Sequence, residues 1–124
     1  MKNKVVLIIV SYNGQKYWPD LLPALAAEKY VDFDLEVVIV DNASTDASAT
    51  YIETNFPNFT LIKLAKNEGF VGGNNTAYYY AKEVGAKYIY LLNQDTVITS
   101  GFLQALYDYA EHNNFGTLQS KINL

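Results

Sequence analysis

The chain has 124 residues, a length that suits one domain rather than two. Half of the residues are hydrophobic and 18% are charged, which supplies enough apolar side chains for a core and excludes intrinsic disorder. Arg is absent and the formal net charge is −4, so we expect no binding to a nucleic-acid backbone. The absence of Cys excludes disulfides and thiolate chemistry.

The first half of the chain alternates between strand and helix patterns. Val5–Val10 is a continuous aliphatic run, typical of a strand that is buried on both faces. Apolar residues at helical spacing then predict a helix over Trp18–Tyr30, with Pro19 in its first turn. Leu35–Val40 predicts a second buried strand, and Asp46–Phe56 predicts a short helix after it.

The second half continues this alternation, and no repeat or linker interrupts it. Phe59–Leu64 predicts a third strand, and Asn74–Val84 predicts a helix that Gly85 closes as a C-cap. Tyr88–Leu92 predicts a fourth strand, and Phe102–Glu111 predicts a fourth helix.

Repeated strand–helix alternation predicts an α/β fold, with a Rossmann-like, mostly parallel sheet and helices on both faces. We expect Asn113, Asn114 and Gly116 to end the last helix. Thr117–Leu124 resembles the start of a further strand and then stops, so we expect the chain to be a truncated piece of a longer protein. No apolar run approaches the roughly 20 residues of a membrane span, so we expect a soluble, cytoplasmic chain.

A polar segment follows each predicted strand. The four segments are Ser11–Gly14, Asp41–Asp46, Asn67–Asn75 and Asn93–Thr96. In a parallel sheet these segments meet at one edge, which is where open α/β proteins bind ligands. Asn, Gly and Asp are also common turn residues, so composition alone does not separate a binding edge from a set of turns.

Two carboxylates at strand ends are the strongest candidates for chemistry. Asp41 is either a turn residue or an acceptor for a nucleobase N–H or a ribose hydroxyl. Asp95 is either a turn residue before Thr96 or the ligand of a magnesium or manganese ion. Such an ion takes one or two carboxylates and completes its shell with substrate phosphates and water. Asp46 is expected to bond free amides where the next helix begins.

Other residues at this edge carry weaker signals. Tyr12 lies in a loop where its ring could stack on a base. Gly69–Gly73 precedes a predicted helix and could direct free amides toward a phosphate, although it matches neither common glycine-rich motif. A flexible turn that covers the core is the alternative. Asp108, Glu111 and His112 are expected on a solvated helix face.

With these residues in view, the chain resembles the nucleotide-binding half of family 2 glycosyltransferases, which have the GT-A fold. Four segments carry the resemblance in order along the chain: Ser11 to Asn13, Asp41 to Asp46, Asn67 to Phe70 with Gly73 and Asn74, and Leu92 to Thr96. The Asn-x-Asp-Thr and Asn-Glu-Gly-Phe strings look most like bacterial rhamnosyltransferases and similar enzymes of cell-surface polysaccharide synthesis. The resemblance implies that residues 1–124 form the nucleotide-sugar-binding part of such a domain, without the acceptor-binding part.

The resemblance also implies a role for individual residues. Tyr12 and Asp41 would hold the nucleobase, and Asp95 would coordinate Mg²⁺ or Mn²⁺. Asn93 stands where the usual acid-x-acid triplet has its first acid, which leaves the metal requirement open. The residues implied in nucleotide-sugar binding are Ser11, Tyr12, Asn13, Asp41, Asn42, Ser44, Asn67, Gly69, Phe70, Gly73, Asn74, Asn93, Gln94 and Asp95.

The reaction that the resemblance implies is inverting transfer of a sugar from a dTDP-, UDP- or GDP-linked donor to a saccharide or lipid-linked acceptor. A base must deprotonate the acceptor hydroxyl, and we expect this base beyond Leu124. The isolated chain is therefore expected to bind donor without turnover. The full-length parent could lie at the inner face of the cell membrane through regions outside this sequence.

Three other interpretations remain open at this point. A non-catalytic nucleotide-sugar-binding module would use the same edge of the sheet. A receiver-like signalling domain has a similar size and sheet, but it should carry acids after the first strand, where this chain has Ser11, Tyr12 and Asn13. A nicotinamide-dependent oxidoreductase should carry a glycine-rich turn there, and only Gly14 is available.

Overall fold

A computed structural model describes residues 1–113 and 117–119 of the chain. Its strands are β1 (Asn3–Ser11), β2 (Phe33–Asp41), β3 (Thr60–Lys63), β4 (Tyr88–Leu91) and β5 (Thr117–Gln119). Its helices are the short 3₁₀ helix η1 (Gln15–Tyr17), α1 (Trp18–Ala26), α2 (Ser48–Asn55), α3 (Gly69–Glu83) and α4 (Phe102–Asn113). The predicted α/β class is confirmed. The expected roles of Asn114 and Gly116 at the end of α4 lie outside the described residues.

The strands pair in parallel, and in the described part of the chain their order is β3-β2-β1-β4-β5. The strand order therefore reverses between β1 and β4, because β2 and β3 lie on one side of β1 and β4 and β5 on the other. Open α/β sheets bind ligands at the carboxyl ends of the strands beside such a reversal. Ser11 is paired with Asp41 in the β1–β2 register, so the polar segments after these two strands begin side by side.

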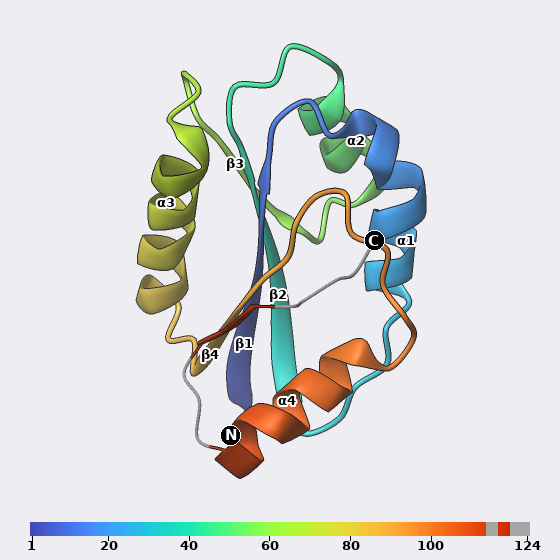
Figure 1. Cartoon of the computed structure of the whole chain (residues 1–124), viewed down its shortest axis with the longest axis vertical. Coiled ribbons are helices and arrows are strands. Elements are labelled where there is room, and N and C mark those ends of the chain that lie inside the picture. The colour runs from blue at the N-terminus through green and yellow to red at the C-terminus, as the bar shows by residue number, and fades with distance from the viewer. Residues whose placement is uncertain (114–116, 120–124) are drawn as a thin grey trace.

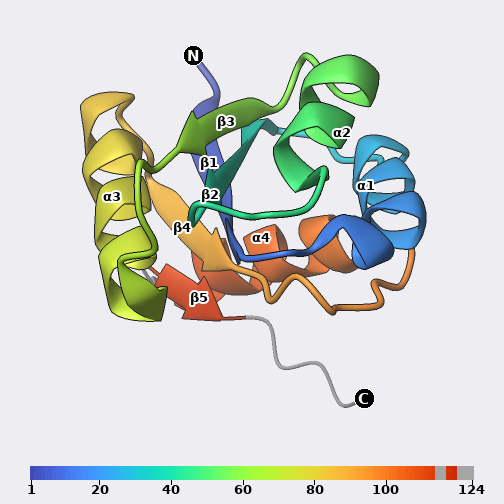
Figure 2. The same ribbon diagram turned by 90° about the horizontal axis from the view of Figure 1, so that it is seen from above.

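Helices cover both faces of the sheet, as the sequence predicts. Figures 1 and 2 show α3 on one face and α1, α2 and α4 on the other. Successive residues of β1 point to opposite faces. Val6 and Ile8 accordingly pack toward Ala77 and Ala81 of α3.

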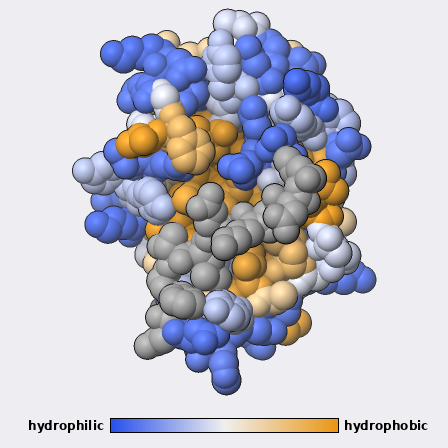
Figure 3. Space-filling view, viewed as in Figure 1, coloured by the Kyte–Doolittle hydropathy of each residue, from blue (hydrophilic) through white to orange (hydrophobic). Residues whose placement is uncertain are grey.

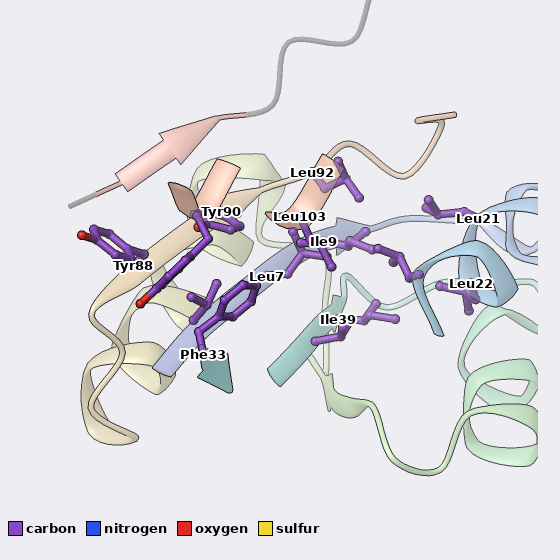
Figure 4. Close-up of a cluster of buried hydrophobic side chains, with 14 of the residues drawn as sticks. Leu7, Ile9, Leu21, Leu22, Phe33, Ile39, Tyr88, Tyr90, Leu92 and Leu103 are labelled. Carbon is purple, nitrogen blue, oxygen red and sulfur yellow. The ribbon is translucent and has the colours of Figure 1, made fainter. Parts of the chain in front are cut away.

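The larger hydrophobic core lies on the opposite face of the sheet, under α1, α2 and α4. Leu7 and Ile9 of β1 belong to it, together with Leu22 of α1 and Leu103 of α4. Figure 4 shows these side chains gathered between the sheet and the helices. Among the described residues, no helix is both long and apolar enough to cross a membrane.

Helix α3 corrects one prediction, because it begins at Gly69 and not near Asn74. The glycine-rich segment is therefore the first part of a helix and not a loop before one. A Cβ atom on Gly73 would lie 2.6 Å from Cγ1 of Val10 in β1. Glycine at this position lets the start of α3 pack directly against the sheet. Helix α1 also differs, since it ends at Ala26 and not at Tyr30.

Candidate functional site

The polar segments after β1, β2 and β4 and the start of α3 surround a pocket of about 420 Å³. It lies at the carboxyl end of the sheet, at the upper end of the molecule in Figure 1. Hydrophilic residues cover most of this upper end in Figure 3, above the apolar surface in the middle of the view. The residues that line the pocket are Val10, Ser11, Tyr12, Tyr17, Asn42, Asn67, Gly69, Phe70, Asn93, Gln94 and Asp95.

Most of the residues that the sequence singles out lie in this pocket, although they are far apart along the chain. The predicted site residues that do not line it are Asn13, Asp41, Ser44, Gly73 and Asn74. Sequence reasoning missed two lining residues, Val10 and Tyr17. Val10 continues the apolar run of β1, and Tyr17 directly precedes the core residue Trp18, so neither position has a polar signature that separates it from the core.

Ser11 is the most unusual polar residue of the pocket. Its side chain is fully buried, and its Oγ has no hydrogen-bond partner among the described residues. A buried hydroxyl without a partner costs free energy, and such groups in native proteins call for an explanation. Because Ser11 lines the pocket, the pocket wall contains a hydroxyl whose hydrogen-bonding capacity is unused.

Asp95 and Asn93 present uncommitted side chains to the same pocket. Both residues are exposed, and neither side chain forms a hydrogen bond or ion pair within the described part of the chain. The turn that holds them is closed by the Thr96 amide, which donates to the Asn93 carbonyl at 3.1 Å. Across residues 1–113 and 117–119, no group of three or more His, Cys, Asp or Glu side chains could hold a metal ion. Asp95 is therefore available to an ion whose other ligands come from elsewhere.

Asp41 lies beside the pocket and shapes the loop after β2. Its carboxylate is buried, and it accepts hydrogen bonds from Ser44 Oγ at 2.5 Å and from the Ser44 amide at 3.1 Å. Ser44 Oγ in turn accepts a hydrogen bond from the Asn13 amide at 2.9 Å. The residues predicted to bind nucleotide here are thus joined to one another.

Asn13 and Asp46 complete the connection between the loops after β1 and β2. Asn13 adopts a left-handed backbone with φ of 50°, and its Oδ1 accepts from the Thr45 amide at 2.8 Å. Asp46 accepts from the Ser48 amide at 2.9 Å, which confirms the prediction that it bonds free amides at the start of a helix. Burial raises the pKa of Asp46, but hydrogen bonds from Ser48 and the Gln15 amide outweigh it and hold the pKa below its ordinary value.

Asn42 joins the end of β2 to the start of α3. It is buried; its Nδ2 donates to the Gly69 carbonyl at 2.8 Å, and its Oδ1 accepts from the Glu68 amide at 2.9 Å. The Asn67 side chain accepts from the Gly69 amide at 2.8 Å within the same turn. The Asn42 side chain therefore holds the part of the pocket wall that Gly69 and Phe70 form.

Gln94 makes the corresponding connection between the segments after β4 and β1. Its Oε1 accepts from the Tyr12 amide, and its Nε2 donates to the Tyr12 carbonyl, each at 3.1 Å. The Tyr12 side chain stays exposed on 44% of its surface at the edge of the pocket. The ring is therefore accessible while its backbone is held.

The model of the family described as "Glycosyl transferase family 2" matches residues 6–122. The chain belongs to this family. Among curated relatives, the poly(ribitol-phosphate) beta-N-acetylglucosaminyltransferase TarS of Staphylococcus aureus is 28% identical over 102 residues, which cover 82% of this chain and 18% of TarS. The dTDP-rhamnosyl transferase RfbF of Shigella flexneri is 30% identical over 116 residues, which cover 92% of this chain and 37% of RfbF.

A solved structure agrees with the sequence comparison. The S. aureus TarS 1–349 structure in complex with UDP-GlcNAc matches with a TM-score of 0.73 and 26% identity, covering 92% of this chain and 32% of that chain. The predicted family and its GT-A type of fold are confirmed. Membership of this family sets aside the receiver-like and nicotinamide-dependent alternatives. The chain spans only a part of the length of each of these relatives.

Proposed function

We propose that this chain forms the nucleotide-sugar-binding part of a glycosyltransferase, with the donor held in the pocket at the carboxyl end of the sheet. The observation that carries the proposal is the convergence of Ser11, Tyr12 and Asp95 in one pocket. Each offers a different contact: an unpartnered buried hydroxyl, an accessible aromatic ring and an uncommitted carboxylate. An activated sugar donor combines polar groups, a base and a charged diphosphate, which these contacts suit.

The proposal includes a divalent ion on Asp95. Mg²⁺ and Mn²⁺ are commonly held by one or two carboxylates, and substrate phosphates and water complete the shell. A single exposed carboxylate without a protein partner fits that mode, and the neighbouring Asn93 side chain offers a neutral oxygen. When bound, the ion would neutralise negative charge that develops on the departing nucleoside diphosphate.

The remaining groups would bind and orient the donor. Tyr12 would stack on the base, while Asp41, fixed by Ser44, would accept a hydrogen bond from the base beside it. TarS and RfbF are named for transfer of N-acetylglucosamine to poly(ribitol phosphate) and for transfer of rhamnose from dTDP. These names support sugar transfer in general, to a polymer in the case of TarS and from a nucleotide-linked donor in the case of RfbF. For this protein we propose inverting transfer to a saccharide or lipid-linked acceptor in cell-surface polymer synthesis.

We further propose that the chain alone binds donor without transferring sugar. A base must deprotonate the acceptor hydroxyl, and Asp95 is the one carboxylate among the described residues that line the pocket. Glu111 bonds to Lys87 and Tyr88, and Asp108 accepts a hydrogen bond from Gln104, so both carboxylates are engaged on α4. The same observation favours a second candidate, a non-catalytic nucleotide-sugar-binding module. Measurable sugar transfer by the chain to any acceptor would contradict both proposals.

Calorimetric titration with UDP, dTDP and GDP, each with and without Mn²⁺, tests the proposed function. We expect the wild-type chain to bind at least one of these nucleotides, and more tightly when Mn²⁺ is present. Asp95→Ala should remove the part of the affinity that depends on Mn²⁺ and leave the metal-free affinity unchanged.

Asp108→Ala is the matched control, because it removes an exposed carboxylate on α4 that does not line the pocket. It should leave every affinity unchanged. If none of the nucleotides binds to the wild-type chain, the proposed function is wrong. If Asp95→Ala binds as the wild type does in the presence of Mn²⁺, the metal assignment alone is wrong.

A further inference from the structure

The contact between Gln94 and Tyr12 joins two segments that are distant in sequence. Both polar atoms of the Gln94 amide are used, because the amide pairs with the N–H and the C=O of the same residue. A side-chain amide in this arrangement imitates the backbone pairing of a neighbouring strand. Gln94 therefore has less left to offer a ligand than its place in the pocket wall indicates.

The sheet itself explains why a side chain is needed here. β1 and β4 pair in register from Val5 with Tyr88 to Ile8 with Leu91, and the Leu92 amide donates to the Ile8 carbonyl at 2.9 Å. Beyond that bond, no further backbone hydrogen bond between the two segments occurs among the described residues. The Gln94 side chain spans the gap where the two segments separate.

Gly14 provides the space for this contact. Its φ is −90°, which any residue adopts, so backbone conformation does not require glycine here. A Cβ atom at this position would lie 2.6 Å from Gln94 Oε1 and 3.0 Å from the ring of Trp18, which is fully buried. Glycine is therefore required by the close approach of the Gln94 amide and the packed indole.

We propose that Gln94 is a positioning residue that holds the Tyr12 loop, and that it acts on donor binding through Tyr12 rather than by touching the donor. Its amide links the segment that carries the accessible ring to the segment that carries Asp95. The effect on binding rests on the proposed function of the pocket, whereas the effect on the Tyr12 backbone does not. The two effects can therefore be measured separately.

Amide hydrogen exchange measured by NMR tests the effect on the backbone. Gln94→Met keeps the length and apolar stem of the side chain and removes both polar atoms. We expect exchange of the Tyr12 amide to become about ten-fold faster or more in this variant. The Tyr17 amide, which donates to the Gly14 carbonyl at 2.9 Å, is the internal control and should not change. Unchanged exchange at Tyr12 would overturn the proposal, whatever the chain binds.

Nucleotide affinity tests whether Gln94 acts through Tyr12. With whichever of UDP, dTDP or GDP binds the wild type, Gln94→Met should weaken binding by about three- to ten-fold, equally with and without Mn²⁺. Tyr12→Ala should weaken binding at least as much, and the double variant should be no weaker than Tyr12→Ala alone. Additive losses would mean that Gln94 contacts the nucleotide itself and would overturn the proposal. If the wild type binds none of the three, the proposed function fails and the exchange experiment alone decides the role of Gln94.

Gly14→Ala tests the same contact by crowding the Gln94 amide instead of removing it. The added methyl group should displace the Gln94 amide, which it would approach most closely and which is less buried than the Trp18 ring. We expect faster exchange at Tyr12 and weaker nucleotide binding, as in Gln94→Met. Faster exchange at Tyr12 in Gly14→Ala with unchanged nucleotide affinity would show that the position of the Tyr12 loop does not matter for binding. It would overturn the proposal that Gln94 acts on donor binding through Tyr12.

Discussion

The amino and carboxyl ends of the sheet differ in how their carboxylates are partnered. At the amino end, Glu36 of β2 forms an ion pair with Lys4 at 2.7 Å and accepts hydrogen bonds from Thr60 and Tyr80. At the carboxyl end, Asp95 has no partner among the described residues, although it lines a pocket. The described part of the chain thus gives Glu36 three partners at one end and leaves Asp95 without one at the other.

The electrostatics of the amino end favour the charged forms. Burial raises the pKa of Glu36, but the hydrogen bonds from Lys4, Thr60 and Tyr80 outweigh it and lower the pKa below its ordinary value of 4.5. The hydrogen bond to Glu36 raises the pKa of Lys4. These groups stabilise the fold, whereas the proposed function assigns the polar groups without partners at the other end to a ligand. This contrast predicts that substitutions at the two ends affect different measurements.

The largest effect on stability is expected for Glu36→Ala. The change leaves Lys4, Thr60 and Tyr80 without their shared acceptor, and we expect a loss of about 2 kcal/mol in the free energy of unfolding. Urea unfolding measures it, and nucleotide affinity should not change. Glu53→Ala is the control, because Glu53 and Lys63 form a 3.4 Å ion pair with side chains 52% and 56% exposed. Glu53→Ala should lower the free energy of unfolding by less than about 0.5 kcal/mol. Equal losses in the two variants would contradict the stabilising role given to the partners of Glu36.

Asp95→Ala should show the opposite pattern. Removal of an exposed carboxylate without a partner should change the free energy of unfolding by no more than about 0.5 kcal/mol. The affinity for nucleotide in the presence of Mn²⁺ should fall by about ten-fold, or about 1.4 kcal/mol. A loss of stability as large as that of Glu36→Ala would show that Asp95 has a structural role instead.

These two ends were not equally predictable from the sequence. The strands and helices follow from local periodicity, and Asp95 is recognisable because it lies in the short polar segment that follows the apolar run ending at Leu92. The partners of Glu36 lie on three other elements, so nothing local indicates them. The predicted start of α3 was wrong because Gly69–Gly73 is typical of a turn. Glycine is needed at position 73 because the helix packs closely against Val10 there. Contacts between segments distant in sequence leave no local pattern.

The role of Gln94 is another case of a distant contact. The sequence places it beside Asp95, and this position alone predicts that it lines the site, which it does. Its pairing with the backbone of Tyr12 spans 82 positions along the chain. Only the way in which β1 and β4 separate beyond their last backbone bond gives the side chain this role.

Acid sensitivity sharpens the description of the amino end. Because the pKa of Glu36 is lowered by folding, its contribution to stability is present above about pH 4.5 and is lost as the pH falls through the lowered value. The difference in unfolding free energy between the wild type and Glu36→Gln should therefore shrink as the pH falls from 6 to 3. Denaturant titrations at several pH values measure it. Hydrogen bonds from Lys87 and Tyr88 lower the pKa of Glu111 as well, so the variant should keep part of the sensitivity.

The smallest effects on stability are expected for two buried hydroxyls without partners, one in the core and one in the pocket wall. Tyr90 lies in the core of Figure 4, and Ser11 lines the pocket; neither hydroxyl has a hydrogen-bond partner among the described residues. Burial raises the pKa of Tyr90, which keeps its hydroxyl neutral. Removing an unsatisfied buried hydroxyl should leave stability unchanged or raise it by up to about 1 kcal/mol, in both Tyr90→Phe and Ser11→Ala.

Ligand binding should separate these two variants. Under the proposed function, Ser11→Ala should weaken nucleotide binding by about three-fold or more, because the bound nucleotide would supply the partner that the Ser11 hydroxyl lacks. Tyr90→Phe should bind as the wild type does, since Tyr90 does not line the pocket. Urea unfolding and calorimetry on the two variants measure both quantities. Equal affinities in Ser11→Ala and the wild type would mean that the free hydroxyl at the strand end is a packing defect like the one in the core, and that unpartnered groups at this end are not reserved for a ligand.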